Sequence, residues 1–279
     1  MSQNRPRAPV ARAPLDALDP PVRGLILDVD GVLWKDAQQI GDLASAFAAI
    51  AARQLGVSIA TNNAMNRVED YLLKLRGFGV QIDAWQVVTS AEATADTLAQ
   101  TLPDRGGVFV VGERGLIEAL QSRGFEVVTD PSADRRYAAV VAGLDRDLTY
   151  AKLRKASTLV RSGLPFYGTN PDETFPTPSG LIPGAGAVLA GISAAAGVPP
   201  TVVGKPSSLL FEIAARRMKL LPEELLIVGD RLETDIQGGQ AFGTRCALVL
   251  SGVSTREQAA AWKPAPTIIA ASLSELLGA

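Results

Sequence analysis

Short apolar segments alternate with longer amphipathic segments along most of this chain. From residue 22 onward the apolar runs have the length of strands, and the segments between them have the spacing of surface helices. Because the runs are apolar throughout, they indicate strands that are buried on both faces of a sheet. The pattern predicts an α/β fold whose core is a doubly wound, Rossmann-like parallel sheet. The expected core strands are residues 22–28, 56–61, 201–204, 224–230 and 245–252, with an edge strand near residue 268.

A long insert separates the second and third of these strands, and it repeats the alternation. Its expected strands lie at residues 108–112, near 127, at 137–143 and at 165–170, with helices starting near Glu113 and Tyr150. An insert of about one hundred residues with several strands can bury a core of its own. We therefore expect a core domain formed by residues 21–99 and 200–279, an inserted α/β cap domain at 100–199, and a disordered tail at 1–20.

Composition excludes several classes of protein. The apolar runs are far shorter than the roughly 20 residues of a membrane span, and the N-terminal segment lacks the apolar centre of a secretory signal. The formal charge of -2, from 27 basic and 29 acidic residues, provides no field to attract nucleic acid or an anionic membrane. The one cysteine, Cys246, permits no internal disulfide, which suits a reducing compartment and predicts a cytoplasmic protein. Composition leaves open whether the chain forms a homo-oligomer.

The chain contains no histidine. Ser-His-Asp triads, Cys-His pairs and imidazole-ligated zinc sites are therefore excluded. Any chemistry must rest on carboxylate, lysine, arginine, hydroxyl and amide groups, with a hard metal ion as the remaining aid.

Acidic residues stand at the ends of two of the expected strands. Asp28 and Asp30 are two positions apart, so their side chains project to the same face, and Gly31 then permits a sharp turn. Asp230 ends a second strand, and Asp235 begins the helix that follows it. Because ligand sites of open parallel sheets lie at the carboxyl ends of the strands, these acids should meet at one site.

Such a cluster of acids needs protons or a cation. Two unit charges about 4 Å apart repel by about 1 kcal/mol in water and about 4 kcal/mol at an effective dielectric near 20. Carboxylate oxygens with water available favour octahedral Mg²⁺ over softer metals, so the cluster predicts a magnesium site. The alternative is that each Asp only caps the helix after it, which is a much weaker explanation for two strand ends than for one.

Two other strand ends offer groups that bind phosphate. Thr61 and Asn62 supply a hydroxyl, an amide and backbone N–H groups near the start of a helix. Lys205 follows another strand and precedes Pro206, which suits the first turn of a helix. Taken singly, the first pair could be a plain turn and the lysine a solvated side chain. Beside three acids, they predict a phosphate clamp.

The segments DVDGVLW, TNN, GKP and GDRLETD, in this order, resemble the four motifs of the haloacid dehalogenase (HAD) superfamily. Specifically, they resemble NagD-like phosphatases, including 4-nitrophenyl phosphatases, which carry a large α/β cap. The resemblance implies that Asp28 is a nucleophile that forms an aspartyl phosphate and that Asp30 is the general acid. It also implies that Mg²⁺ is bound by Asp28, by Asp230 and by the backbone carbonyl of Asp30.

The same resemblance assigns the supporting groups. Thr61, Asn62 and Lys205 would hold the oxygens of the transferring phosphoryl group. Asp235 would either orient Lys205 or contact a metal-bound water.

Within the expected cap, the segment GTNPDETF matches a segment of the family. Asn170 and Asp172 are therefore candidates for lining the entrance to the site, although both residues also suit an ordinary turn. The predicted function is Mg²⁺-dependent hydrolysis of a small phosphorylated metabolite, such as 4-nitrophenyl phosphate, phosphoglycolate, pyridoxal phosphate or a nucleoside monophosphate. The alternatives are a phosphomutase acting on a sugar phosphate and a catalytically silent protein that binds a phosphate ligand.

Overall fold

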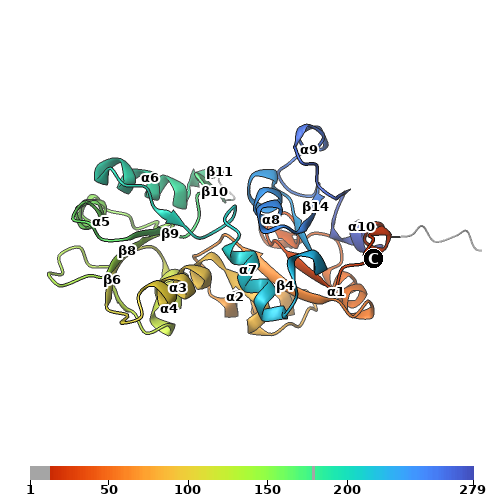
Figure 1. Ribbon diagram of the computed structural model, residues 1–279, viewed down its shortest axis with the longest axis horizontal. Coiled ribbons are helices and arrows are strands. Elements are labelled where there is room, and N and C mark those ends of the chain that lie inside the picture. The colour runs from red at the N-terminus through yellow and green to blue at the C-terminus, as the bar shows by residue number, and fades with distance from the viewer. Residues whose placement is uncertain (1–12, 178–179) are drawn as a thin grey trace, which may run out of the picture.

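Two parallel sheets, each with helices on both faces, form the two halves of the molecule in the computed structural model (Figure 1). The structure describes residues 13–177 and 180–279. One half, which we call the core, contains the first and last strands of the chain, and the other half, the cap, contains the middle ones.

The core sheet has six strands in the order β15-β14-β13-β1-β4-β5. Every neighbouring pair is parallel. From β1 the chain first moves outward to one edge and later returns to build the other edge, so the strand order reverses between β1 and β13. The doubly wound sheet expected from the sequence is confirmed. Its strands are β1 (Gly24–Leu27), β4 (Gly56–Thr61), β5 (Val87–Thr89), β13 (Leu225–Gly229), β14 (Arg245–Val249) and β15 (Ile268–Ala270).

Apolar side chains fill both faces of the core sheet. One cluster packs the sheet against the helices α1 (Leu43–Ala52), α2 (Val68–Gly77) and α10 (Leu273–Leu277). The second cluster packs the other face against α7 (Leu209–Met218), α8 (Gln237–Phe242) and α9 (Arg256–Ala261). Burial on both faces explains why the strands are apolar at consecutive positions.

The cap sheet is also parallel, with the order β12-β9-β8-β6-β7. Figure 1 shows α5 and α6 above this sheet and α3 and α4 below it. The cap strands are β6 (Gly107–Val111), β7 (Glu126–Val128), β8 (Ala139–Ala142), β9 (Phe166–Gly168) and β12 (Thr201–Val202). The helices are α3 (Ser90–Thr101), α4 (Arg114–Ser122), α5 (Tyr150–Arg161) and α6 (Ala185–Ala196).

The prediction that residues 201–204 form a core strand was wrong. Thr201 and Val202 pair with Tyr167 and Gly168 of the cap sheet instead. The chain leaves α6 beside the free edge of β9 and reaches the core only at Val203, which is fully buried in the core cluster. Strand β5 was not predicted, because it is only three residues long and just two of them, Val87 and Val88, are apolar.

Short elements complete the chain. Two antiparallel hairpins are formed by β2 (Trp34–Lys35) with β3 (Gln38–Gln39), and by β10 (Thr174–Thr177) with β11 (Gly180–Pro183). The single turns are η1 (Pro14–Ala17), η2 (Ala84–Gln86), η3 (Pro222–Glu224) and η4 (Leu232–Ile236). Residues 1–12 of the expected tail lie outside the described residues, whereas Leu15 is buried in the core cluster.

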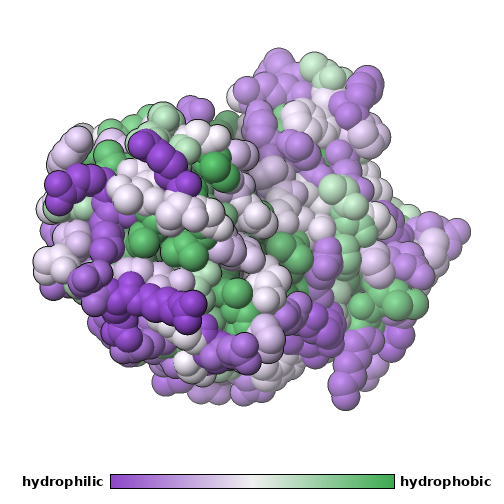
Figure 2. All heavy atoms as spheres, turned by 60° about the vertical axis from the view of Figure 1, so that its left-hand side comes forward, coloured by the Kyte–Doolittle hydropathy of each residue, from purple (hydrophilic) through white to green (hydrophobic). Residues whose placement is uncertain are grey.

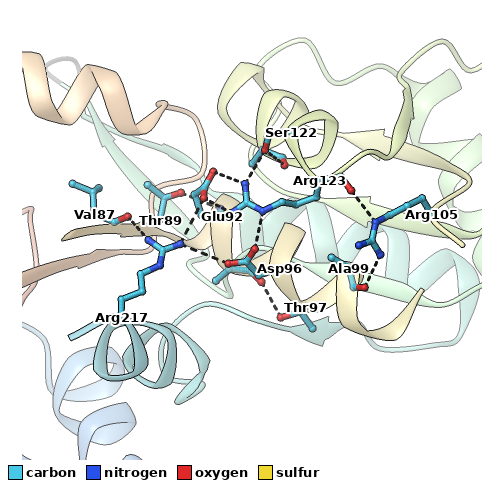
Figure 3. A network of polar contacts seen from close by, with 12 residues as sticks. Val87, Thr89, Glu92, Asp96, Thr97, Ala99, Arg105, Ser122, Arg123 and Arg217 are labelled. Carbon is cyan, nitrogen blue, oxygen red and sulfur yellow. Dashed lines mark hydrogen bonds and ion pairs between the residues drawn. The ribbon is translucent and has the colours of Figure 1, made fainter. Parts of the chain in front are cut away.

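Charged residues connect the two halves through α3 (Figure 3). Arg123, which follows α4 of the cap, donates to Glu92 at 2.6 Å and to Asp96 at 2.8 Å, both on α3. Arg217 of core helix α7 approaches the same two acids at 3.8 and 3.7 Å. Arg217 also donates to the Val87 carbonyl in the core sheet. We call these four side chains, Glu92, Asp96, Arg123 and Arg217, the inter-domain cluster.

Within residues 13–177 and 180–279, no helix is long and apolar enough to cross a membrane. On the face shown in Figure 2, hydrophilic residues surround small separate groups of hydrophobic ones.

Candidate active site

The two strand ends at the reversal point of the core sheet carry the first two acids. Asp28 directly follows β1, and its N–H donates to the Val228 carbonyl of β13 at 2.9 Å. Asp230 directly follows β13. The crevice outside such a reversal point is where open α/β sheets bind ligands, because the loops on its two sides diverge there.

Asp230 is held by a loop that follows β14. Its Oδ2 accepts a hydrogen bond from Val253 N–H at 2.7 Å, and its carbonyl accepts one from Ser254 N–H at 3.0 Å. A Cβ atom at Gly252 would lie 1.9 Å from that Oδ2, and one at Gly31, where φ is +87°, would lie 2.5 Å from it. Both positions therefore require glycine. Sequence reasoning missed the loop at 251–254, although a glycine just after an apolar strand was a usable signal.

Lys205 lies at the centre of the site with all three ammonium protons used. Its Nζ donates to Asp28 Oδ1 at 2.5 Å, to Asp235 Oδ1 at 2.7 Å and to the Ala60 carbonyl at 3.0 Å. Burial alone would lower the pKa of Lys205, but the carboxylates of Asp235 and Asp28 outweigh it and raise that pKa. The lysine is therefore charged at neutral pH.

Asp235 makes its contacts within the protein. Its Oδ1 accepts from Lys205, while its Oδ2 accepts from Arg231 N–H at 3.2 Å and from the Thr234 hydroxyl at 3.4 Å. The residue is 1% exposed. Of the two roles expected for Asp235, this geometry favours the one that orients Lys205.

Burial raises the pKa of both Asp28 and Asp230, although positive charge lies nearby. Burial raises the pKa of Asp28, Lys205 opposes this, and the carboxylates of Asp235 and Asp230 add to the increase. Burial, reinforced by Asp235, raises the pKa of Asp230 to about 6. A positive charge placed between these two carboxylates would offset both effects.

The donor set fits a divalent cation. Asp28, Asp230 and Asp235 each offer a carboxylate oxygen, and these oxygens lie within 4.8 Å of one another. Asp230 Oδ1 is buried and has no hydrogen-bond partner among the described residues. Since the Asp235 oxygens already accept hydrogen bonds, Asp28 and Asp230 are the side chains available to a hard metal ion such as Mg²⁺. The Asp30 side chain does not belong to this group.

Asp30 lies at the rim of the site. Val29 is fully buried on the opposite side of the chain, whereas Asp30 is exposed and bridges to Trp34 through the backbone. Although solvent reaches the residue, protein atoms crowd its carboxyl group, and this desolvation raises the pKa of Asp30 against the opposing charges of Lys74, Lys205 and Arg231. A raised pKa suits a group that holds a proton.

The end of β4 and the loop after it bring Thr61 and Asn62 to the same edge. Thr61 is 2% exposed, and its Oγ1 accepts from Asn63 N–H at 3.2 Å. Asn62 Nδ2 donates to the Lys205 carbonyl at 3.0 Å, and Asn62 Oδ1 is buried without a partner in the described part of the chain. The structure thus brings Thr61 and Asn62 together with Lys205.

The cap reaches this loop through the two candidates named from the sequence. Asn170 Nδ2 donates to the Asn62 carbonyl at 2.7 Å, and Asp172 Oδ2 accepts from Asn62 Nδ2 at 3.2 Å. Asn170 Oδ1 also accepts from Asp172 N–H at 3.1 Å, which is the turn expected as the alternative. The segment is therefore a turn that fastens the cap to the loop at Asn62.

The core sheet carries acids and a charged lysine at the point where its strand order reverses, and it is joined to a second α/β domain. This combination is typical of one class of hydrolase. The chain belongs to the haloacid dehalogenase-like hydrolases: that family's model matches residues 25–126, and a HAD-hydrolase-like model matches residues 202–276. Within this family it is a NagD-like phosphatase, an enzyme acting on phosphate monoesters.

Curated relatives cover almost the whole chain. The acid sugar phosphatase of Staphylococcus saprophyticus is 32% identical over 255 residues, which are 91% of this chain and 96% of that protein. The 5'-nucleotidase YutF of Bacillus subtilis is 32% identical over 253 residues, again 91% and 96%.

Solved structures share the architecture. NagD from E. coli K-12 superposes with a TM-score of 0.83 at 33% identity, covering 91% of this chain and 98% of NagD. Glycerol phosphate phosphatase Rv1692 from Mycobacterium tuberculosis, solved in complex with magnesium, gives a TM-score of 0.84 at 30% identity and covers 95% of this chain and 78% of that one.

Proposed function

We propose that this protein hydrolyses small phosphate monoesters with the help of Mg²⁺, through an aspartyl phosphate formed on Asp28. The main observation behind the proposal is the position of the Lys205 ammonium, which donates hydrogen bonds to both Asp28 and Asp235. A phosphoryl dianion can approach a carboxylate only where positive charge offsets the repulsion. Lys205 supplies part of that charge.

Magnesium bound to Asp28 and Asp230 would supply the remaining positive charge and keep Asp28 ionised. Its support is the buried Oδ1 of Asp230, which has no partner within residues 13–177 and 180–279, and the acidic cluster around it. A relative of the same architecture has been solved with this metal.

The reaction would run in two steps on the residues of this chain. An Asp28 oxygen attacks phosphorus, the bond from phosphorus to the leaving oxygen breaks with its electron pair, and Asp30 gives that oxygen a proton. Water then attacks phosphorus in the aspartyl phosphate and gives a proton to Asp30. The bond between phosphorus and the Asp28 oxygen breaks, so inorganic phosphate leaves and the Asp28 carboxylate is restored. Thr61 and Asn62 would hold the phosphoryl oxygens in both steps, and Lys205 would do so with the N–H that it gives to Asp28 when no substrate is bound.

The substrate would be a small phosphorylated metabolite whose leaving group fits beneath the cap. Relatives are named for sugar phosphates, nucleotides and glycerol phosphate, and these three classes are the first esters to test.

The first prediction concerns Asp28→Asn. We expect the purified wild-type protein to hydrolyse 4-nitrophenyl phosphate with Mg²⁺ and to lose the activity in EDTA. Asp28→Asn should lower kcat at least about 1,000-fold, because it removes the attacking carboxylate. Exposed Asp104, changed to Asn, is the matched control and should keep full activity. Full activity in Asp28→Asn would contradict the nucleophile assignment.

The two alternatives predict different outcomes from a panel of phosphate esters. Release of inorganic phosphate supports the phosphatase, whereas conversion of a sugar phosphate into its isomer supports a phosphomutase. Binding of these esters without turnover would leave the silent binding protein.

A further inference from the structure

Side chains on one face of α2 and at its C-terminal end pack around the indole ring of Trp34. Tyr71 stacks on that ring at a centroid distance of 6.2 Å, and Phe78 packs against it at 6.0 Å. Lys74 places its Nζ 4.2 Å from the centre of the same ring. These three residues have the i, i+3, i+7 spacing that puts side chains on one helix face. Trp34 itself is 3% exposed.

Lys74 makes a second contact with the β2–β3 hairpin. Its Nζ donates to the carbonyl of Asp36 at 2.6 Å. Asp36 lies in the hairpin turn at a φ of +53°, in the left-handed region that Asp adopts more readily than most residues other than glycine. A donor aimed at the carbonyl of Asp36 stabilises this turn, so Lys74 contacts both the base and the tip of the hairpin.

The hairpin is connected to the rim of the active site by backbone hydrogen bonds. Gly31 N–H donates to the Trp34 carbonyl at 2.8 Å, and Trp34 N–H donates to the Val29 carbonyl at 3.3 Å. Asp30 lies between these two contacts and forms a bridge with Trp34. Any shift of Trp34 therefore moves the backbone of Asp30.

We infer that Lys74 is a positioning residue for proton transfer, because it fixes the hairpin that sets where the Asp30 carboxyl group lies. This inference rests on the proposed function, in which Asp30 protonates the leaving oxygen. Lys74 itself does not touch the reacting atoms. Its ammonium contacts Trp34 and Asp36, and through the hairpin these contacts fix where Asp30 lies.

The leaving group provides a readout that separates this role from general structural support. When the bond from phosphorus to an alkoxide breaks, the leaving oxygen needs a proton, so the position of Asp30 matters. A 4-nitrophenolate leaves as a stable anion and needs none. Misplacement of Asp30 should therefore slow hydrolysis of an alkyl phosphate and spare that of 4-nitrophenyl phosphate.

The test compares kcat/KM for glycerol phosphate and for 4-nitrophenyl phosphate in variants of the whole chain with Mg²⁺, because kcat/KM reports only the steps up to departure of the leaving group, before Asp30 takes a proton from water. Lys74→Met should lower kcat/KM about tenfold for glycerol phosphate and less than about threefold for 4-nitrophenyl phosphate. Lys74→Arg keeps a cation and a donor, so it should restore the ratio of the two rates. Arg76→Met, on an exposed position of the same helix, is the matched control and should leave both rates unchanged. If Lys74→Met does not fold, Lys74→Gln replaces it in the comparison.

Equal losses on the two substrates would show that Lys74 only supports the fold and would overturn the inference. Unchanged rates in Lys74→Met, or a ratio that Lys74→Arg fails to restore, would overturn it as well. A wild-type protein that hydrolyses neither ester would instead contradict the proposed function.

Discussion

At the scale of single residues, the position of the Asp230 side chain depends on two neighbouring glycines. Gly31 and Gly252 have no side chains, and this leaves room for the Asp230 carboxylate. Its Oδ2 is satisfied by backbone N–H, whereas its Oδ1 is left unpartnered inside the described structure. An unpaired buried oxygen costs free energy in the metal-free protein, and a bound cation would recover it.

The raised pKa of Asp230 gives a prediction about stability in EDTA. A folded-state pKa of about 6, against an ordinary value of 3.8, means that the folded protein holds this proton more tightly than the unfolded chain. Its contribution to stability is therefore present at low pH and is lost as pH rises from about 4 to about 6. Two pKa units correspond to on the order of 3 kcal/mol. Asp28 shifts in the same direction.

Mg²⁺ should reverse this loss, because it stabilises the ionised carboxylates. We expect the increase in Tm on adding Mg²⁺ to be larger at pH 7.5 than at pH 5, measured by thermal unfolding. Asp230→Asn should abolish most of the increase. An increase that is equal at both pH values, or that persists in Asp230→Asn, would contradict this account.

At the scale of secondary-structure elements, the start of α6 is pressed against the turn that fastens the cap. A Cβ atom at Gly186 would lie 2.2 Å from the Pro171 carbonyl oxygen, and one at Gly184 would lie 2.3 Å from the Asp172 carbonyl oxygen. Gly186 N–H donates to that Asp172 carbonyl at 2.8 Å. The two glycines therefore permit close packing of α6 against this turn.

Gly186→Ala should force α6 away from this turn. We expect a loss of about 2 kcal/mol in the free energy of unfolding, as for other overpacked sites. Gly191→Ala is the matched control on the same helix, since its Cβ would meet only Leu153, at 3.4 Å. That control should be neutral or stabilise the protein by up to about 1 kcal/mol. Urea unfolding of both variants measures the difference, and equal effects would refute the packing argument.

Elements also show what the sequence could predict. The acids after β1 and β13 were found because strand ends of a parallel sheet converge, a rule that needs only local pattern and chain order. Lys205 was brought to the same site although the strand expected before it belongs to the other sheet. Lys74 and the loop at 251–254 were missed, because their importance arises from contacts between segments distant in sequence. For the same reason β12 was placed in the wrong sheet. Its two residues carry no information about which edge they join.

At the scale of the whole molecule, the inter-domain cluster links a cap helix to a core helix through two shared acids. Arg123 and Arg217 can each neutralise Glu92 and Asp96 when the other is absent, but removing both leaves two partly buried carboxylates unpaired (Figure 3). The two arginines should therefore be coupled.

A double-mutant cycle tests this coupling. We expect Arg123→Met to lower the free energy of unfolding by about 2 kcal/mol, and Arg123→Met with Arg217→Met to cost at least about 0.5 kcal/mol more than the sum of the single variants. Arg135→Met is the control, because its partner Glu126 is 59% exposed, and it should cost under about 1 kcal/mol. Strictly additive losses in urea unfolding would argue against a shared cluster.

The return of the chain from cap to core has a consequence for the size of ester that the enzyme can turn over. Val202 lies in the cap sheet, and Gly204 N–H donates to the Thr169 carbonyl of the cap at 2.8 Å. Lys205 is the next residue, so its backbone adjoins the cap, while its ammonium is held in the core by Asp28, Asp235 and the Ala60 carbonyl. A phosphate ester bulky enough to lift the cap would therefore pull against the contacts that fix the charge its own phosphoryl group needs.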